Sequence, residues 1–131
     1  MVLFHAFSSQ DERREFGGSY FIEIQYCALA RGTKMEKIIS VDAPHWKGDS
    51  LYVYGDDEET FVSQYGEVFP DGTYCNGERG IMDTCGLNYY TPGQVHSIID
   101  RIEKAKPLDY QILLDWLKRA DAYNGIYVMG L

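Results

Sequence analysis

The segment TPGQVHSIIDRI, residues 91–102, decides how the C-terminal third of the chain folds. Thr91 and Gln94 have the spacing of a capping box, and Pro92 stands where the fixed φ of proline suits a first helical turn. The apolar residues that follow recur at helical spacing: Val95, Ile98, Ile99 and Ile102. The segment therefore predicts an amphipathic helix that buries one face.

A second helix is expected after Pro107. Its apolar positions again share one face; they are Tyr110, Leu113, Leu114 and Leu117, with Ile112, Trp116 and Ala120 beside them. Asn124-Gly125 then predicts a turn, and residues 126–129 a final strand.

The N-terminal half has the alternation of strands. In YFIEIQYCALA, residues 20–30, Glu23 and Gln25 stand opposite an apolar set, which predicts a strand with one buried face. Residues 35–41 are expected to return as its hairpin partner across a turn at residues 31–34. Further short strands are expected at residues 2–7 and 51–54, with a loop or one helical turn at residues 8–18.

Capping and turn residues predict the structure of the middle of the chain. A short helix is predicted here from three features. Asp57 can cap its start, Phe61, Val62 and Tyr65 have helical spacing, and Gly66 stands at the C′ position. Residues 66–80 contain Asp71-Gly72 and Asn76-Gly77 and predict a loop or tight hairpin. Residues 81–90 are expected to contain a buried extended segment.

These elements predict an α+β fold, an antiparallel sheet packed against two C-terminal helices. The 131 residues are enough for a single domain, 1–131, and 45% hydrophobic residues argue against general disorder. An odd cysteine count, Cys27, Cys75 and Cys85, and the absence of a signal-peptide pattern or long apolar run predict a cytoplasmic protein outside the membrane.

Charge is distributed unevenly. The chain has 20 acidic and 12 basic residues and a net charge of −8, which argues against direct binding of nucleic acid or of an anionic membrane. The segment Gly48–Cys85 accounts for the whole excess, because only Arg79 opposes its acidic residues. These are Asp49, Asp56, Asp57, Glu58, Glu59, Glu67, Asp71, Glu78 and Asp83.

Aromatic residues are interspersed with these carboxylates. They are Tyr52, Tyr54, Phe61, Tyr65, Phe69 and Tyr74. Tyrosines supply contact area, and carboxylates raise the rate at which a basic partner is encountered, so the segment predicts a surface that binds a basic protein. The alternative is a solvating face in which some of the tyrosines are buried. The predicted partner-binding residues are Asp49, Tyr52, Tyr54, Asp56, Asp57, Glu58, Glu59, Tyr65, Glu67, Asp71, Tyr74 and Glu78.

Motifs for catalysis or cofactors are not found in the sequence. His5, His45, His96 and the cysteines have no zinc-site spacing, and the acidic loops lack the register of a calcium-binding EF-hand. We therefore expect no enzyme, cofactor or metal; the least improbable catalytic set would be Cys85, Asp83 and His96. Asp83 is flanked by apolar residues, and an acceptor for turn amides is its favoured interpretation.

Size, charge and C-terminal pattern together give a resemblance of type. The C-terminal pattern consists of Gly86-Leu-Asn-Tyr-Tyr-Thr-Pro, the two short helices and Tyr123-Asn-Gly-Ile-Tyr-Val-Met-Gly130. With the size and charge of the chain, this pattern resembles small bacterial immunity proteins of polymorphic toxin and contact-dependent inhibition systems. The resemblance implies a cytoplasmic inhibitor that blocks a basic cognate toxin, commonly a nuclease. Alternatives that the sequence leaves open are a DNA-mimicking anti-defence protein of a phage, a small enzyme that uses Cys85, and a structural or oligomerising protein.

Overall fold

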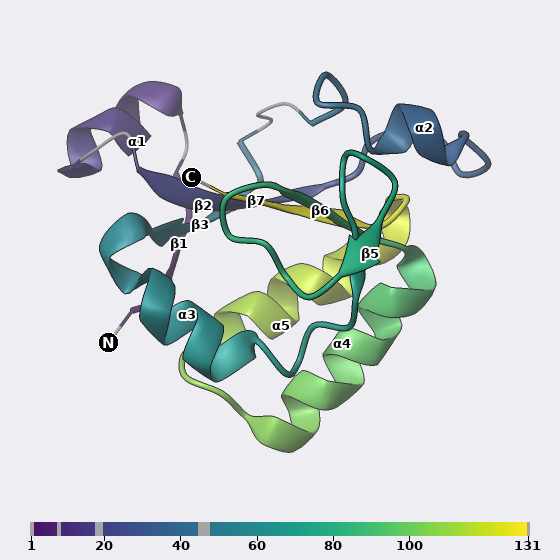
Figure 1. Ribbon diagram of the computed structural model, residues 1–131. Helices are drawn as coiled ribbons and strands as arrows, with labels where there is room; N and C mark the ends of the chain where they lie inside the picture. The colour runs from purple at the N-terminus through teal and green to yellow at the C-terminus, as the bar shows by residue number, and fades with distance from the viewer. Residues whose placement is uncertain (1, 8, 18–19, 45–47, 131) are drawn as a thin grey trace.

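The computed structural model describes residues 2–7, 9–17, 20–44 and 48–130. One sheet divides the molecule into layers (Figure 1). Helices α3 (Glu58–Tyr65), α4 (Pro92–Ala105) and α5 (Tyr110–Lys118) cover one face of the sheet, and α1 (Gln10–Gly17) and α2 (Met35–Ile38) lie on the other. The predicted α+β fold, with an antiparallel sheet against the two C-terminal helices, is confirmed.

The sheet has seven strands in the order β1-β3-β2-β7-β6-β4-β5, and every pair is antiparallel. Their bounds are β1 Phe4–His5, β2 Phe21–Tyr26, β3 Leu51–Tyr54, β4 Gly72–Thr73, β5 Arg79–Gly80, β6 Leu87–Tyr90 and β7 Ile126–Met129. The described residues also form the 3-10 helices η1 (Gly55–Asp57), before α3, and η2 (Arg119–Ala122), after α5.

The main core lies between the sheet and the three helices. Ile22, Ile24 and Tyr26 alternate along β2 and face this core, as their spacing predicts. The Tyr26 ring stacks on Trp116 of α5, with ring centroids 3.9 Å apart, and on Tyr123 at 4.5 Å. This aromatic stack attaches the central strand to the C-terminal helices.

The opposite face of the sheet is also partly buried. Ile38 of α2 covers one cluster with Tyr89 and Tyr127. The Arg13 guanidinium of α1 lies over the rings of Phe21 and Tyr52 in a second cluster. The alternation along β2 predicted that its polar side faces solvent. In the structure, α1 and α2 cover part of that face of the sheet.

Local expectations for α4 are confirmed. The Thr91 side chain accepts from the Gln94 backbone N–H, the Gln94 side chain accepts from the Thr91 N–H, and Pro92 opens the helix. Val95, Ile98 and Ile102 are buried. The strands at 51–54 and 126–129, the short helix ending at Tyr65 and the hairpin within 66–80 also form.

Several expectations are wrong. Residues 35–41 form no strand; α2 begins there, and β2 pairs with β3 and β7 instead, so both its edges are occupied. Residues 10–17 form an eight-residue helix rather than a single turn. Gly66 has an ordinary right-handed φ of −56°. By contrast, the buried extended segment expected within residues 81–90 does form, because all four residues of β6 are buried.

Among the described residues, no helix is both long enough and apolar enough to cross a membrane.

Candidate partner-binding surface

The start of α3 gathers carboxylates. Asp56 and Asp57 end η1, and Glu58 and Glu59 form the first turn of α3. Negative charge is favourable at this end of a helix, because the macrodipole leaves partial positive charge there. Asp56 and Glu59 are exposed, and Asp57 and Glu58 are half-buried.

A distant turn adds one more carboxylate. The Thr84 hydroxyl donates to Glu58 Oε1 at 2.5 Å, which brings the turn at residues 83–86 against α3. Asp83 in this turn is exposed, and its Oδ1 accepts from the Cys85 N–H at 2.9 Å. Asp83 is thus an acceptor for a turn amide, as favoured from its sequence. We call Asp56, Asp57, Glu58, Glu59 and Asp83 the acidic surface.

Buried Asn88 holds this turn, a role that no pattern in the sequence indicates. It donates from Nδ2 to the Asp83 and Val128 carbonyls at 2.8 and 2.9 Å. Its Oδ1 accepts from the Asp83 N–H at 2.8 Å.

The remaining predicted carboxylates lie elsewhere. Asp49 is at the opposite end of β3, where its carbonyl accepts from Trp116 Nε1 at 2.6 Å. Glu67 lines a groove of about 300 Å³ between α3 and α4. Asp71 directly precedes β4, and Glu78 directly precedes β5 within the β4–β5 hairpin. The structure therefore brings together four of the predicted acidic residues, not all of them.

Two of the predicted tyrosines are core residues. Tyr52 is 1% exposed and Tyr65 is fully buried, so neither lies on a surface that a partner could touch. The Tyr65 hydroxyl donates to the Leu108 carbonyl at 2.6 Å, and burial raises the pKa of Tyr65. Tyr54 and Tyr74 are half-buried, and the Tyr74 hydroxyl donates to the Ile81 carbonyl.

A pocket of about 340 Å³ adjoins the acidic surface. Val2, His5, Tyr54 and Asp57 line it. Tyr54 and Asp57 are predicted site residues that the fold brings into one pocket. Val2 and His5 could not be added from the sequence, because they are distant from Tyr54 along the chain. The antiparallel register of β1 and β3, in which His5 lies opposite Tyr52, brings this segment to the pocket.

The acidic surface has no ion-pair partner within the described part of the chain. Among the residues that the structure describes, the ion pairs are Arg14 with Asp11 and His96 with Asp121, and neither includes a carboxylate of Gly48–Cys85. A charge without an internal partner remains available to a cation from outside.

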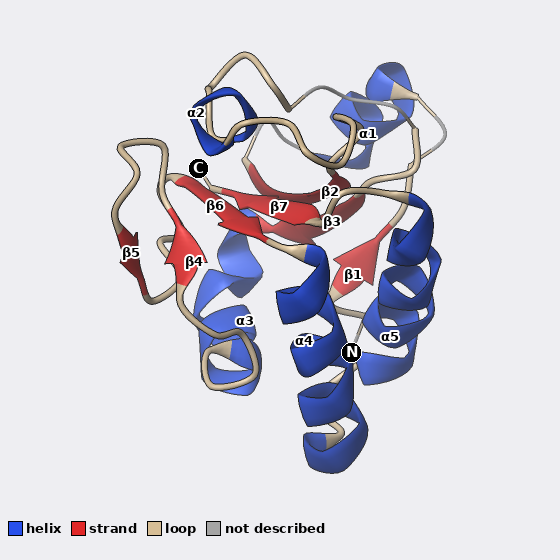
Figure 2. Cartoon of the chain, turned by 90° about the vertical axis from the view of Figure 1, so that its right-hand side faces the viewer, coloured by secondary structure: helices blue, strands red, loops and turns tan. Residues whose placement is uncertain are grey.

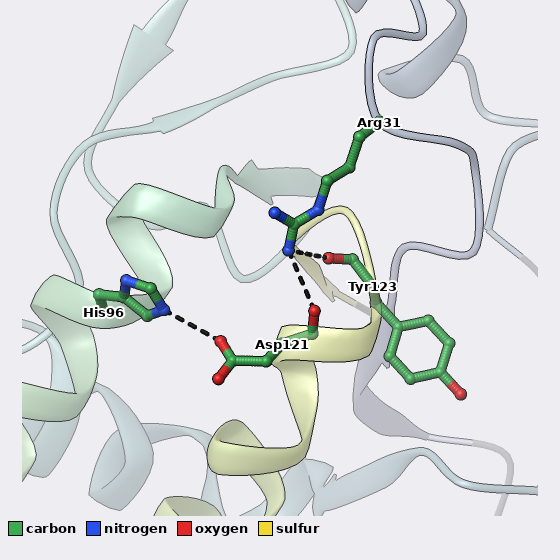
Figure 3. Close-up of polar contacts among 4 residues, drawn as sticks. All are labelled: Arg31, His96, Asp121 and Tyr123. Carbon is green, nitrogen blue, oxygen red and sulfur yellow. Dashed lines mark hydrogen bonds and ion pairs between the residues drawn. The ribbon is translucent and has the colours of Figure 1, made fainter.

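The residues considered for catalysis do not form a site. Cys85 precedes β6 and His96 follows it, so a four-residue strand about 13 Å long separates them. His96 Nε2 instead lies 3.0 Å from Asp121 Oδ1, and Arg31 donates to the Asp121 and Tyr123 carbonyls (Figure 3). Both side chains of the His96–Asp121 pair are more than half exposed, so the contact contributes little stability.

Metal ligands are not clustered either: in the described parts of the chain, no three His, Cys, Asp or Glu side chains are grouped to hold an ion. His45 lies outside the described residues.

Comparisons with known proteins assign no family. No protein-family model matches the chain, and neither a curated protein nor a solved structure is significantly similar to it.

Proposed function

We propose that this chain is an inhibitor of the immunity-protein type, which binds a basic protein, in the first instance a nuclease toxin, through the acidic surface. The observation that carries the proposal is the group of carboxylates around the start of α3, with which no described residue forms an ion pair. Such a group raises the rate of encounter with a basic cleft and can form charge pairs within it.

The pocket beside the acidic surface supports a specific contact. The Tyr54 ring and the Asp57 carboxylate are suited to an arginine or lysine side chain, since the ring attracts a cation and the carboxylate pairs with it. A cytoplasmic location is part of the proposal and is supported by the three unpaired thiols, Cys27, Cys75 and Cys85.

The test separates the position of the charge from its amount. One variant carries Asp56→Lys, Asp57→Lys and Glu59→Lys; its matched control carries Glu36→Lys, Asp100→Lys and Glu103→Lys. All three control positions are exposed, and both variants change the net charge equally. Glu58 is left unchanged because it accepts the Thr84 hydrogen bond.

Tagged wild type and both variants are used to capture proteins from source-cell lysate at ~50 and ~500 mM salt. We expect wild type and control to retain one basic protein, more weakly at high salt, and the acidic-surface variant to lose it. That protein, once purified, should be a nuclease that the wild-type chain inhibits. Thermal melts show whether each variant folds.

Equal retention by the two variants would rule out the acidic surface as the interface. A retained partner whose nuclease activity is unaffected by the chain would instead rule out inhibition.

A further inference from the structure

A pocket of about 310 Å³ is lined by residues of the β4–β5 hairpin, of α2 and of the start of α4. Figure 2 shows the hairpin at one edge of the sheet, next to β6. Its lining residues are Met35, Thr73, Arg79, Thr91 and Gln94. None of them belongs to the acidic surface, so the pocket is a separate feature of the molecule.

Strand pairing places the cation of this pocket. Thr73 and Arg79 are register partners in β4 and β5, and directly opposed residues project on the same side of a sheet. Arg79 is the only basic residue of Gly48–Cys85. It is exposed, and no described residue forms an ion pair with it.

The start of α4 adds further donors. Thr91 Oγ1 accepts from the Gln94 backbone N–H at 3.2 Å, which leaves the hydroxyl proton available. Gln94 Nε2 donates one hydrogen to the Asp71 carbonyl at 2.8 Å and retains a second. The positive end of the 14-residue helix lies at the same place.

Thr73 is the independent sign of a ligand. The residue is only 7% exposed and lines the pocket, yet its hydroxyl forms no hydrogen bond with any described residue. Among the described residues, the unpartnered side-chain oxygens that are closed to solvent are the hydroxyls of Tyr52 and Tyr90. The Thr73 hydroxyl is not one of them, so it is open to the pocket and has a donor without a partner. A ligand atom in the pocket would supply that partner.

The pocket therefore differs in charge from its surroundings. Its polar lining consists of a guanidinium, two hydroxyls and an amide, and none of the lining side chains is a carboxylate. Asp71 and Glu78 adjoin these residues in sequence but do not line the pocket. Hydrogen-bond donors around one cation are the arrangement that recognises an oxyanion.

We propose that this pocket binds the oxyanion group, phosphate or carboxylate, of a small molecule. The Arg79 guanidinium pairs with the charge, and the hydroxyls of Thr73 and Thr91 donate to the oxygens. Met35, which is 41% exposed, forms an apolar wall for the carbon part of the ligand. This site does not depend on the inhibitor function.

Binding is tested by NMR titration of the ¹⁵N-labelled full chain with inorganic phosphate and, separately, with acetate. Sodium chloride at matched ionic strength is the reference. We expect saturable shifts of the amides of Thr73, Arg79 and Gln94 with at least one of the two anions. Phosphate alone indicates a phosphorylated ligand, and acetate alone a carboxylate.

Two variants assign the site. Arg79→Gln should weaken anion binding at least about tenfold, since hydrogen bonds to charged groups are strong. Lys118→Gln is its matched control: it removes one positive charge at an exposed position on α5 and should bind as wild type. Thr73→Val should weaken binding severalfold without lowering the midpoint of thermal unfolding in anion-free buffer.

The proposal is overturned if neither anion gives saturable shifts, or if sodium chloride reproduces them. It is also overturned if Arg79→Gln and Thr73→Val, both folded by their melts, bind phosphate and acetate as wild type does.

Discussion

Asn88 shows how much a single buried amide can organise. It is fully buried and uses both ends of its side chain, with three hydrogen bonds to Asp83 and Val128. Asn88→Ala leaves those backbone groups without partners, and we expect the free energy of unfolding to fall by about 2–4 kcal/mol. Urea denaturation measures this change.

The control is Asn76→Ala. Asn76 also accepts a backbone hydrogen bond, from the Glu78 N–H at 2.9 Å, but in an exposed turn, so its loss should cost less than about 1 kcal/mol. Equal effects of the two variants would show that burial of Asn88 does not matter.

Tyr52 and Tyr54 show which features of a residue can be predicted from the sequence and which cannot. Alternation places Tyr52 and Tyr54 on one side of β3, which the structure confirms, since both belong to the cluster around Phe7 and Phe21. It does not reveal that α1 covers Tyr52. Burial depends on what packs over a strand, and that is decided by residues distant in the chain.

At the scale of elements, a helix or strand that is marked by neighbouring residues can be predicted from the sequence. An element whose apolar residues fit both the helical and the strand period cannot. The capping box of α4 is complete within four residues, so it could be read directly. Met35, Ile38 and Ile39 fit a helix as well as a strand, because a short apolar run satisfies both periods. The pairing of β2 with β3 and β7 leaves no free edge for a strand there, and α2 forms instead.

The end of α4 carries measurable strain. Lys106 is its C-cap and has a left-handed conformation, with φ of 47° and ψ of 57°, which costs a non-glycine residue about 1 kcal/mol. Lys106→Gly should therefore raise the free energy of unfolding by about 0.5–1 kcal/mol. Chemical denaturation provides the measurement.

Lys104→Gly is the matched control, because it removes the same charge from the last turn of the same helix. Within a helix, glycine should lower the free energy of unfolding by about 1 kcal/mol. Changes of the same sign in the two variants would contradict the role assigned to the backbone of Lys106.

For the whole molecule, charge is contiguous in the sequence but not in space. The nine carboxylates of Gly48–Cys85 are distributed over the far end of β3, the start of α3, the groove between α3 and α4, the β4–β5 hairpin and the turn before β6. Asp83 joins the acidic surface only through the contact between Thr84 and Glu58, 26 positions apart. Composition therefore predicts an acidic protein, whereas the position of its acidic surface follows from tertiary contacts.

The number of buried tyrosines makes the whole fold sensitive to alkaline pH. Burial raises the pKa of Tyr26 to about 12 and that of Tyr89 to about 12. In the unfolded chain each ionises near 10.0, so unfolding releases protons above that pH. Their contribution to stability is present below pH 10 and is lost as pH rises from 10 through 12.

Tyr26→Phe isolates one such contribution. The variant loses the hydrogen bond to the Trp116 carbonyl, 2.7 Å in the wild type, and should be about 1 kcal/mol less stable at pH 7. Because phenylalanine does not ionise, the difference in stability from wild type should narrow and then reverse as pH rises from 10 toward 12, changing by up to roughly 1.4 kcal/mol per pH unit. Urea denaturation at several pH values measures this difference.

Leu114→Ala is the control, because it also changes a core residue but removes no titrating group. Its difference in stability from wild type should stay constant with pH. Constant differences for both variants would contradict the role of Tyr26 burial.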